Sequence, residues 1–185
     1  ERLTGTERMV GEWKTLLGSR PAFEGVVFAL DVAPDHSSAT IAAACKIPDG
    51  SWVQSAEDER RAGIDWIVPR WDELRAKYGG RLVVEQTGTA AFLLPLLDGA
   101  EGVSRRFFAD ACSSLDAAVT SRSLRHGNQT ELNDAVAVAR WSSSGEAGQR
   151  VLSRKDPRVS PLVAAALALH GLSAASPRGA RFASF

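Results

Sequence analysis

Residues 26–35 read VVFALDVAPD, and this stretch decides the fold because it joins a core strand directly to a carboxylate. Val26 to Leu30 form an apolar run of strand length, which is typical of a strand buried in the middle of a sheet. Asp31 follows at the end of this run. An unpaired buried charge is costly, so this carboxylate must be matched by something positive. A charged group positioned in this way indicates a functional site.

The residues after this strand predict a three-stranded meander. The turn-forming residues PDHSS (34–38) bring the segment ATIAAACKI (39–47) back as an antiparallel partner. A second turn, PDG (48–50), leads into a third strand that begins with SWVQSAE (51–57). A short amphipathic helix over 4–17 precedes the meander.

The rest of the chain alternates between helices and strands. Apolar residues recur at helical spacing between 64 and 78, Pro69 marks a kink or the true start of that helix, and Gly79–Gly80 end it. The fourth strand, RLVVEQTG (81–88), contains a second strand-end acid, Glu85. A fifth strand is expected over 103–110, and helices over 89–97, 111–124, 130–141 (with Thr130 as N-cap) and 160–172.

These elements predict an α/β fold with a central mixed sheet of five or more strands flanked by helices. A chain of 185 residues is long enough for one domain with a substantial core. We expect an N-terminal helix and linker over 1–24, the α/β domain over 25–172 and a flexible tail over 173–185.

Composition and short motifs limit the possible functions of the chain. Lys+Arg and Asp+Glu are both 22, so bulk charge gives no sign of nucleic-acid binding and any such surface must be a local basic patch. Cys45 and Cys112 lack metal-ligand spacing and are expected to be buried, reduced thiols. The sequence shows no signal peptide, and it contains no apolar segment long enough to predict a membrane span. The chain contains no P-loop and begins without Met, which is compatible with a piece of a longer protein.

The strand-end acids predict a metal centre. Asp31 and Glu85 belong to strands that are expected to be neighbours, and Mg²⁺ or Mn²⁺ prefers such hard oxygen ligands. Two such ions can activate water and stabilise the transition state of phosphodiester hydrolysis. Asp156, flanked by Arg154, Lys155 and Arg158, is the favoured third ligand, with Asp134 and Asp110 as alternatives. The competing interpretations are a turn cap for Asp31, a salt bridge for Glu85, helix caps for Asp156 and Asp110, and a solvated position for Asp134.

The ordered series ALDVAPDHSSATIAAA, VVEQTGTAA, ACSSLDAAVTSRSLRHGNQTELNDAVAVA and RKDPRVSPLVAAALALHG resembles the nuclease domain of the large terminase subunit of tailed bacteriophages, in its actinobacterial phage or prophage form. The resemblance spans residues 25–172. It implies a ribonuclease H-like fold and a two-metal (Mg²⁺ or Mn²⁺) endonuclease that cuts concatemeric viral DNA in the host cytoplasm during packaging. The partners that it implies are double-stranded DNA, an ATPase domain that is absent from this chain, the small terminase subunit and the portal.

By position, the resemblance makes Asp31 and Glu85 catalytic metal ligands. Many relatives carry the third aspartate at the start of the last helix, where this chain has Ser160–Pro161, and Asp156 is the nearest acid. Basic residues are candidates for DNA contact: Arg105, Arg106, Arg122, Arg125, Arg154 and Lys155. His36 and His126 are weaker candidates, for which a turn position and a surface position are the simpler interpretations.

Other functions remain open at this point. A transposase- or integrase-like strand transferase would need the same acids, but this chain lacks a site-specific DNA-binding module. Sugar-kinase-like and actin-like ATPases need a glycine-rich phosphate loop after the first strand, and APDHSS contains no glycine. A non-catalytic docking domain for the portal or motor is the third alternative.

Overall fold

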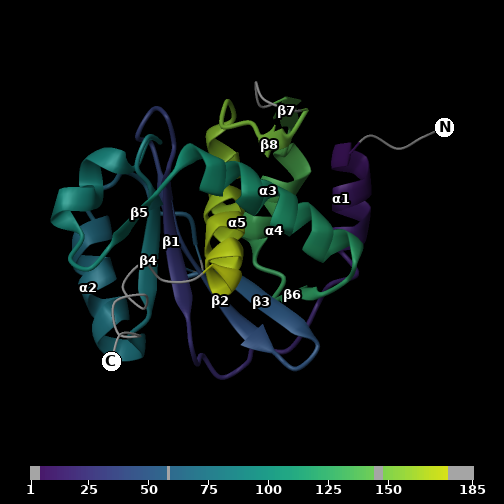
Figure 1. The fold of residues 1–185 in the computed structure, drawn as a ribbon, viewed down its shortest axis with the longest axis horizontal. Coiled ribbons are helices and arrows are strands. Elements are labelled where there is room, and N and C mark those ends of the chain that lie inside the picture. Colours follow the sequence, from purple (N-terminus) through teal and green to yellow (C-terminus); the bar gives the residue numbers. More distant parts are fainter. Residues whose placement is uncertain (1–4, 58, 144–147, 175–185) are drawn as a thin grey trace, which may run out of the picture.

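The computed structural model describes residues 5–57, 59–143 and 148–174. A mixed sheet forms its centre, with α5 lying across one face and α2 covering part of the other (Figure 1). The helices are α1 (Gly5–Trp13), α2 (Ile67–Tyr78), α3 (Arg105–Thr120), α4 (Thr130–Val138) and α5 (Ser160–Ser173), with 3₁₀ helices η1 (Ala91–Leu96) and η2 (Pro157–Val159). The strands are β1 (Val27–Val32), β2 (Ala39–Ile47), β3 (Gly50–Ser55), β4 (Arg81–Glu85), β5 (Glu101–Val103), β6 (Leu124–His126), β7 (Trp141–Ser143) and β8 (Arg150–Leu152).

The sheet has six strands in the order β5-β4-β1-β2-β3-β6, which agrees with the expected mixed sheet of five or more strands. β1, β2 and β3 form the predicted antiparallel meander, whereas β4 pairs with β1 in parallel. β5 and β6 extend the two edges in parallel with β4 and β3. β7 and β8 form a separate antiparallel hairpin.

Side chains of β1 alternate between two cores. Val27 and Ala29 belong to the core formed with α1, α3, α4 and α5, whereas Phe28 and Leu30 belong to the core formed with α2 and η1. Both faces of β1 are therefore covered, which explains why its sequence is continuously apolar rather than alternating.

α5 is buried on nearly all sides, because its small and apolar residues let it lie between the sheet and helices α3 and α4. The close approach is clearest at Gly171, where an added Cβ would come 2.6 Å from Val27 Cγ1. The predicted helix over 160–172 is confirmed, and its position next to β1 fixes the environment of Asp31.

The prediction of a strand over 103–110 was wrong. β5 ends at Val103, and Ser104 caps α3 by accepting a hydrogen bond from the Phe107 amide at 3.1 Å. Apolar residues at helical spacing then carry α3 through the region that was divided between a strand and a later helix.

Other boundaries differ for local reasons. Pro69 lies in the first turn of α2, so it marks the start of the helix, and Gly79 ends it with a positive φ of 64°. The segment with Pro95 forms the 3₁₀ helix η1. The N-cap of α4 is Gln129 rather than Thr130. Strands β6, β7 and β8 are three residues each, too short for a period to be recognised in the sequence.

Cys45 and Cys112 are buried free thiols, as expected. Burial raises the pKa of Cys112 to about 11. No helix among the described residues has the length and apolar character that crossing a bilayer requires. Most of the expected tail, residues 175–185, lies outside the described residues.

Candidate functional site

Asp31 and Glu85 meet at one edge of the sheet because β1 and β4 are parallel and in register. Leu30 pairs with Val84, so the next residue along each strand places Asp31 beside Glu85. Their side chains point to the face that carries α3 and α5. Ala29 and Val83, two residues earlier on each strand and therefore on the same face, belong to that core. Asp31 is 3% exposed and Glu85 is 2% exposed. The structure therefore brings the two acids together at the ends of neighbouring strands, as the sequence predicted.

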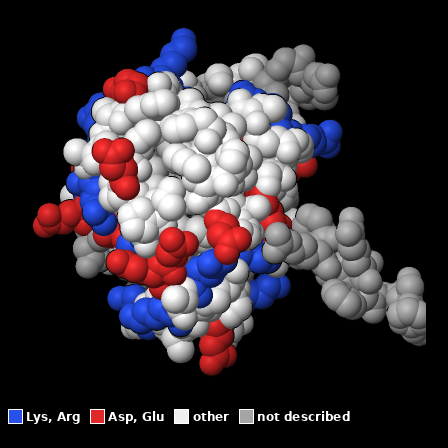
Figure 2. Space-filling model, turned by 90° about the vertical axis from the view of Figure 1, so that its left-hand side faces the viewer, with Lys and Arg blue, Asp and Glu red and all other residues white. Residues whose placement is uncertain are grey.

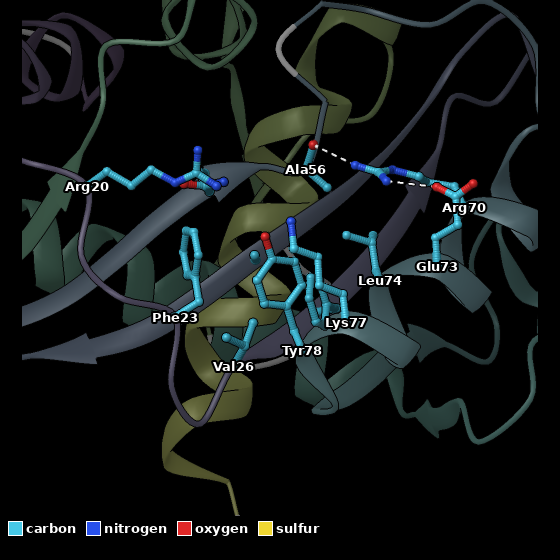
Figure 3. Close-up of a pocket in the computed structure, with 12 residues that line it drawn as sticks. Arg20, Phe23, Val26, Ala56, Arg70, Glu73, Leu74, Lys77 and Tyr78 are labelled. Atoms are coloured by element: carbon cyan, nitrogen blue, oxygen red, sulfur yellow. Dashed lines mark hydrogen bonds and ion pairs between the residues drawn. The ribbon is translucent and has the colours of Figure 1, made fainter.

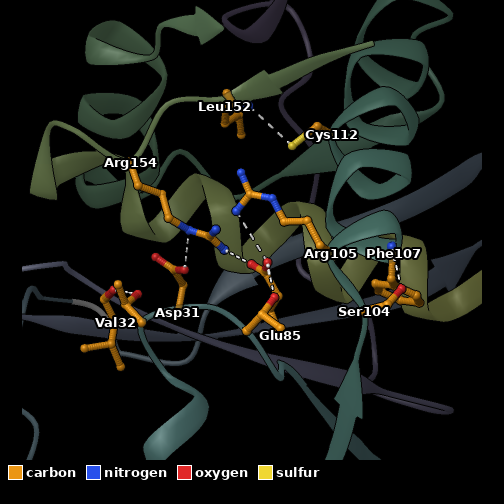
Figure 4. Close-up of polar contacts among 11 residues, drawn as sticks. Asp31, Val32, Glu85, Ser104, Arg105, Phe107, Cys112, Leu152 and Arg154 are labelled. Atoms are coloured by element: carbon orange, nitrogen blue, oxygen red, sulfur yellow. Dashed lines mark hydrogen bonds and ion pairs between the residues drawn. The ribbon is translucent and has the colours of Figure 1, made fainter. Parts of the chain in front are cut away.

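Arg154 lies between the two carboxylates and contacts both (Figure 4). Its Nε donates to Asp31 Oδ1 at 3.1 Å, and its Nη2 lies 2.7 Å from Glu85 Oε2. The guanidinium also stacks over the Phe108 ring, with Cζ 4.0 Å from the ring centroid. Only 13% of the Arg154 side chain is exposed, so this is a buried ion-pair network.

Further groups surround each carboxylate. Arg105 Nη1 lies 3.5 Å from Glu85 Oε1, and the Thr87 hydroxyl donates to the same oxygen at 3.4 Å. Ser160, the first residue of α5, donates its hydroxyl to the Asp31 backbone carbonyl at 3.2 Å. The positive end of the α5 dipole therefore lies beside Asp31.

Burial raises the pKa of Asp31 to about 6, although Arg154 and Ser160 act in the opposite direction. Burial also works against the charge of Arg154, but the two carboxylates more than compensate and raise its pKa. The arginine therefore stays charged, and Asp31 ionises close to neutral pH.

The donor set fits a hard divalent cation in part. Two buried carboxylates come from neighbouring strands, and Glu85 Oε2 accepts no hydrogen bond of good geometry from any described residue, despite its short contact with Arg154. Oxygen ligands of this kind suit Mg²⁺ or Mn²⁺. Within the described part of the chain, however, no three acidic, His or Cys side chains are grouped so as to hold a metal ion. The position between the two acids is taken by Arg154.

The predicted third ligand, Asp156, does not contact this pair. It is the N-cap of η2, accepts from the Arg158 amide at 3.0 Å, and forms an ion pair with Arg158 Nη2 at 2.7 Å. Hydrogen bonds from Arg158 lower the pKa of this partly exposed carboxyl. Arg154, two residues earlier on the same segment, is the residue that reaches the acids.

The two alternative third ligands also lie elsewhere. Asp134 is an exposed residue of α4, as its solvated interpretation predicted. Asp110 lies within α3, not at a strand end or helix start, and accepts hydrogen bonds from Arg106 and Gln149.

The basic candidates divide into two groups. Arg105 and Arg106 lie in the first turn of α3 instead of on a strand, and Lys155 is exposed next to Arg154. Arg125 instead lies on the edge strand β6, where it pairs with Asp49 at 3.2 Å. Two strands separate β6 from β1, so Arg125 lies roughly 14 Å or more from the acids. Arg122 pairs with Glu12 at 3.4 Å.

The two weaker histidine candidates have structural contacts. His126 is fully buried on β6, stacks on Trp13 with ring centroids 4.1 Å apart, and has Nε2 2.9 Å from the Trp13 carbonyl. Its burial on a strand corrects both interpretations, the DNA contact and the surface position. His36 has a positive φ of 57° in the turn after β1 and stacks on Phe92.

A separate hollow of about 230 Å³ lies on the opposite face of the sheet, beside α2 (Figure 3). Phe28 and Ala43 point into it from the strands, and Tyr78 and Lys77 come from α2. Arg70 is held there by Glu73 at 2.9 Å. Neither Asp31 nor Glu85 lines this hollow, so it is not part of the carboxylate site.

The face seen in Figure 2 shows acidic and basic side chains interspersed around a broad uncharged area. This view is the α2 side of the molecule. Phe92 and Leu96 of η1 are large apolar side chains that are exposed. A mixed distribution of this kind agrees with the zero net charge and gives no continuous basic stripe on this face.

Sequence reasoning missed the role of Arg154 as a bridge between the acids. It was considered only as a DNA contact, because no periodicity reports a pairing across 123 residues of sequence. The one usable signal was that two buried strand-end acids require positive charge nearby. Phe108, which supports the arginine, was assigned to a strand and so could not be placed.

Comparison with known proteins identifies structural relatives. No family model matches the sequence, and no curated protein matches it significantly. The solved structure of the HK97 bacteriophage large terminase superimposes with a TM-score of 0.66 at 16% identity, covering 89% of this chain and 42% of that one. The large terminase nuclease from thermophilic phage G20c gives 0.60 at 14% identity, covering 89% of this chain and 97% of that one. The same nuclease with bound magnesium gives 0.60 at 15% identity, covering 87% and 95%.

These matches confirm the predicted fold. The chain has the ribonuclease H-like architecture of large terminase nuclease domains, with a six-stranded sheet. It spans almost the whole G20c nuclease but less than half of the HK97 protein. At this level of identity, the likeness establishes the fold.

Proposed function

We propose that this chain is a divalent-metal-dependent endodeoxyribonuclease that cuts concatemeric viral DNA during genome packaging, by two-metal phosphodiester hydrolysis. The observation that carries the proposal is the pairing of two buried carboxylates, Asp31 and Glu85, at the ends of adjacent parallel strands. The shared fold supports it, because a nuclease of that fold has been solved with bound magnesium and with bound cobalt.

In this proposal Asp31 and Glu85 are the primary ligands for Mg²⁺ or Mn²⁺. When bound, such ions supply Lewis acidity and a water of lowered pKa. Ser160 and the start of α5 hold the backbone of Asp31 in place, and Thr87 orients Glu85 from its own turn. These contacts fix the two carboxylates before any substrate arrives, which is the condition for an efficient site.

Asp156 is proposed as the third ligand, supplied by movement of its segment. Arg154 and Asp156 are two residues apart, between β8 and η2, and the arginine already reaches both acids. Among the described residues, the Asp156 side chain pairs with Arg158, which is itself 56% exposed. A shift of residues 154–157 that withdraws Arg154 is the motion that would bring Asp156 towards the site.

Double-stranded DNA is the proposed substrate. Arg105, Arg106 and Lys155 are exposed and lie on the elements that border the carboxylates. Arg105 is the closest of the three, since its guanidinium contacts Glu85 while 61% of its side chain is exposed. Such cations would bind the phosphates on either side of the cleaved bond. An ATPase domain, the small terminase subunit and the portal are the proposed partners, in the host cytoplasm.

Cleavage of supercoiled plasmid tests the function. The purified chain should nick or linearise plasmid in the presence of Mn²⁺ or Mg²⁺, and EDTA should stop it. Asp31→Asn should abolish cleavage while the circular dichroism spectrum stays unchanged, because the substitution removes charge but not volume. Equal cleavage by this variant, or cleavage in EDTA, would contradict the proposal.

One observation favours a second candidate function. Because Arg154 pairs with both acids, the domain can be stable without metal and act only as a docking module for the packaging motor. Failure of the wild-type chain to bind Mn²⁺ with or without DNA would favour this alternative.

A further inference from the structure

Arg154 occupies the place that a cation shared by Asp31 and Glu85 would need. It contacts Oδ1 of one carboxylate and Oε2 of the other, and its guanidinium lies between the two side chains (Figure 4). A divalent ion binds carboxylate oxygens at roughly 2.0–2.2 Å. A guanidinium within hydrogen-bonding distance of the same atoms leaves no room for it, and the two positive charges would repel.

The arginine is well supported in this position. Phe108 stacks on its guanidinium, and the chain before it is anchored by Ser153, whose amide donates to the Arg140 carbonyl at 2.8 Å. Leu152 is buried, and its amide donates to Cys112 Sγ at 3.4 Å. Arg154 therefore holds a defined place instead of sampling the surface.

The segment after Arg154 is held less firmly. Lys155 is exposed, and Asp156 and Arg158 pair mainly with each other. Displacement of Arg154 breaks its own pairs with the two acids, but the residues that follow it are held by exposed contacts, whereas the carboxylates lie on buried strands. Of Asp31, Glu85 and Arg154, the arginine is therefore the one that can be displaced without disturbing the sheet.

We infer that Arg154 is a positioning residue that holds Asp31 and Glu85 in the metal-free protein and must be displaced before a divalent cation binds. This inference rests on the proposed function, since it concerns the same site. Its consequence is that the site binds metal weakly until Arg154 finds another anionic partner. A DNA phosphate is such a partner, because arginine binds phosphate and carboxylate with the same planar arrangement of donors.

Calorimetric titration of Mn²⁺ into the metal-free protein tests the inference without reference to cleavage. Arg154→Gln should bind Mn²⁺ at least about tenfold more tightly than the wild type, which corresponds to about 1.4 kcal/mol. Arg125→Gln is the matched control, because it removes a positive charge at the far edge of the sheet, where this arginine pairs with Asp49, and its Mn²⁺ affinity should equal that of the wild type. Duplex DNA with an uncleavable phosphorothioate backbone should raise the affinity of the wild type and have little effect on that of Arg154→Gln.

Arg154→Lys is a second variant that keeps the test informative if Arg154→Gln does not fold. A lysine ammonium keeps the charge but cannot contact both acids with a planar fork, so its Mn²⁺ affinity should lie between those of the wild type and Arg154→Gln. Thermal unfolding gives an independent measurement: Mn²⁺ should raise the Tm of both Arg154 variants more than that of the wild type.

The outcomes separate the two proposals. If the wild type and the variants bind Mn²⁺ equally, or the variants bind it more weakly, Arg154 does not compete with the ion, and the inference is overturned while the nuclease proposal stands. If no form binds Mn²⁺ with or without DNA, the nuclease proposal fails and the inference fails with it. Tighter binding by Arg154→Gln, lost again in Arg154→Gln/Asp31→Asn, supports both.

Discussion

Asp31 and Glu85 lie side by side as a direct result of the pairing between β1 and β4, one residue beyond the paired Leu30 and Val84. Both strands are buried on both faces, so neither acid can be moved without breaking sheet hydrogen bonds. The spacing between the two carboxylates is therefore a property of the fold, and the variable part of the site is what lies between and above them.

The glycine after β4 should be required for the position of Glu85. A Cβ at Gly88 would lie 2.9 Å from Glu85 Oε2, and Arg154 restricts the retreat of that carboxylate. Gly88→Ala should lower Mn²⁺ affinity and plasmid cleavage by about tenfold or more, since displacement of a reacting group by about 1 Å has large effects. Gly11→Ala is the control: nothing lies within 4 Å of its added Cβ, so it should leave both unchanged. Normal Mn²⁺ binding by Gly88→Ala would show that Glu85 adjusts freely.

The stability of the metal-free protein should depend on pH through Asp31. The pKa of this carboxyl is about 6 in the folded state against 3.8 for an ordinary aspartate, so between these values the folded state keeps the proton that the unfolded state has lost. Stability from this group is present below about pH 4 and is lost as pH rises through about 6, by up to about 3 kcal/mol.

Chemical denaturation of the wild type and Asp31→Asn over this pH range isolates the effect. Because Asn cannot ionise, the difference in unfolding free energy between the two proteins should move in favour of the variant as pH rises. A difference that stays constant from pH 4 to pH 7 would show that Asp31 titrates normally.

The proposed role of Asp156 as third ligand can be tested by removing its charge and by placing an aspartate at position 160 instead. Asp156→Asn should keep the η2 cap, since Asn caps as well as Asp, and should weaken Mn²⁺ binding by about tenfold because one anionic ligand is lost. Adding Ser160→Asp to this variant should restore the affinity, because residue 160 lies at the start of α5 beside Asp31. Unchanged Mn²⁺ binding by Asp156→Asn would remove Asp156 from the site.

The basic residues near the acids should determine DNA affinity, and Arg125 should not. Arg105→Gln and Lys155→Gln should each weaken binding to duplex DNA similarly for all sequences, and each should reduce the slope of log K against log salt by about 1. Arg125→Gln is the comparison, because this arginine is paired with Asp49 at the far edge of the sheet. Fluorescence anisotropy over a range of salt concentrations, with EDTA present, measures all three. A slope for Arg125→Gln that falls as much as the others would place DNA across β6 instead.

Prediction from sequence succeeded where local pattern and tertiary role agree. Continuous apolar runs identified β1, β2 and β4, and the burial of α5 follows from its composition. Asp31 and Glu85 were found because they interrupt such runs. The error over 103–110 arose because two adjacent phenylalanines are typical of strands, whereas the Ser104 cap and helical spacing decide in favour of α3.

The contact between Arg154 and the acids could not be predicted in the same way. It depends on the path of β8 and η2 over the end of the sheet, which no local signal encodes. Ser160 illustrates the same limit: the sequence indicated its place at the start of the last helix, but not its hydrogen bond to the Asp31 carbonyl.

Helix α5 is buried on nearly all sides, so the part of the site that it forms is rigid. Helix α5 lies against β1 and β2 as well as α3, so its first residue, Ser160, cannot shift without disturbing the whole interior. The displacement of Arg154 that we propose therefore falls on the stretch just upstream, residues 154–157. Substitutions confined to this stretch should therefore change the metal affinity of the site and leave the rest of the fold as it is.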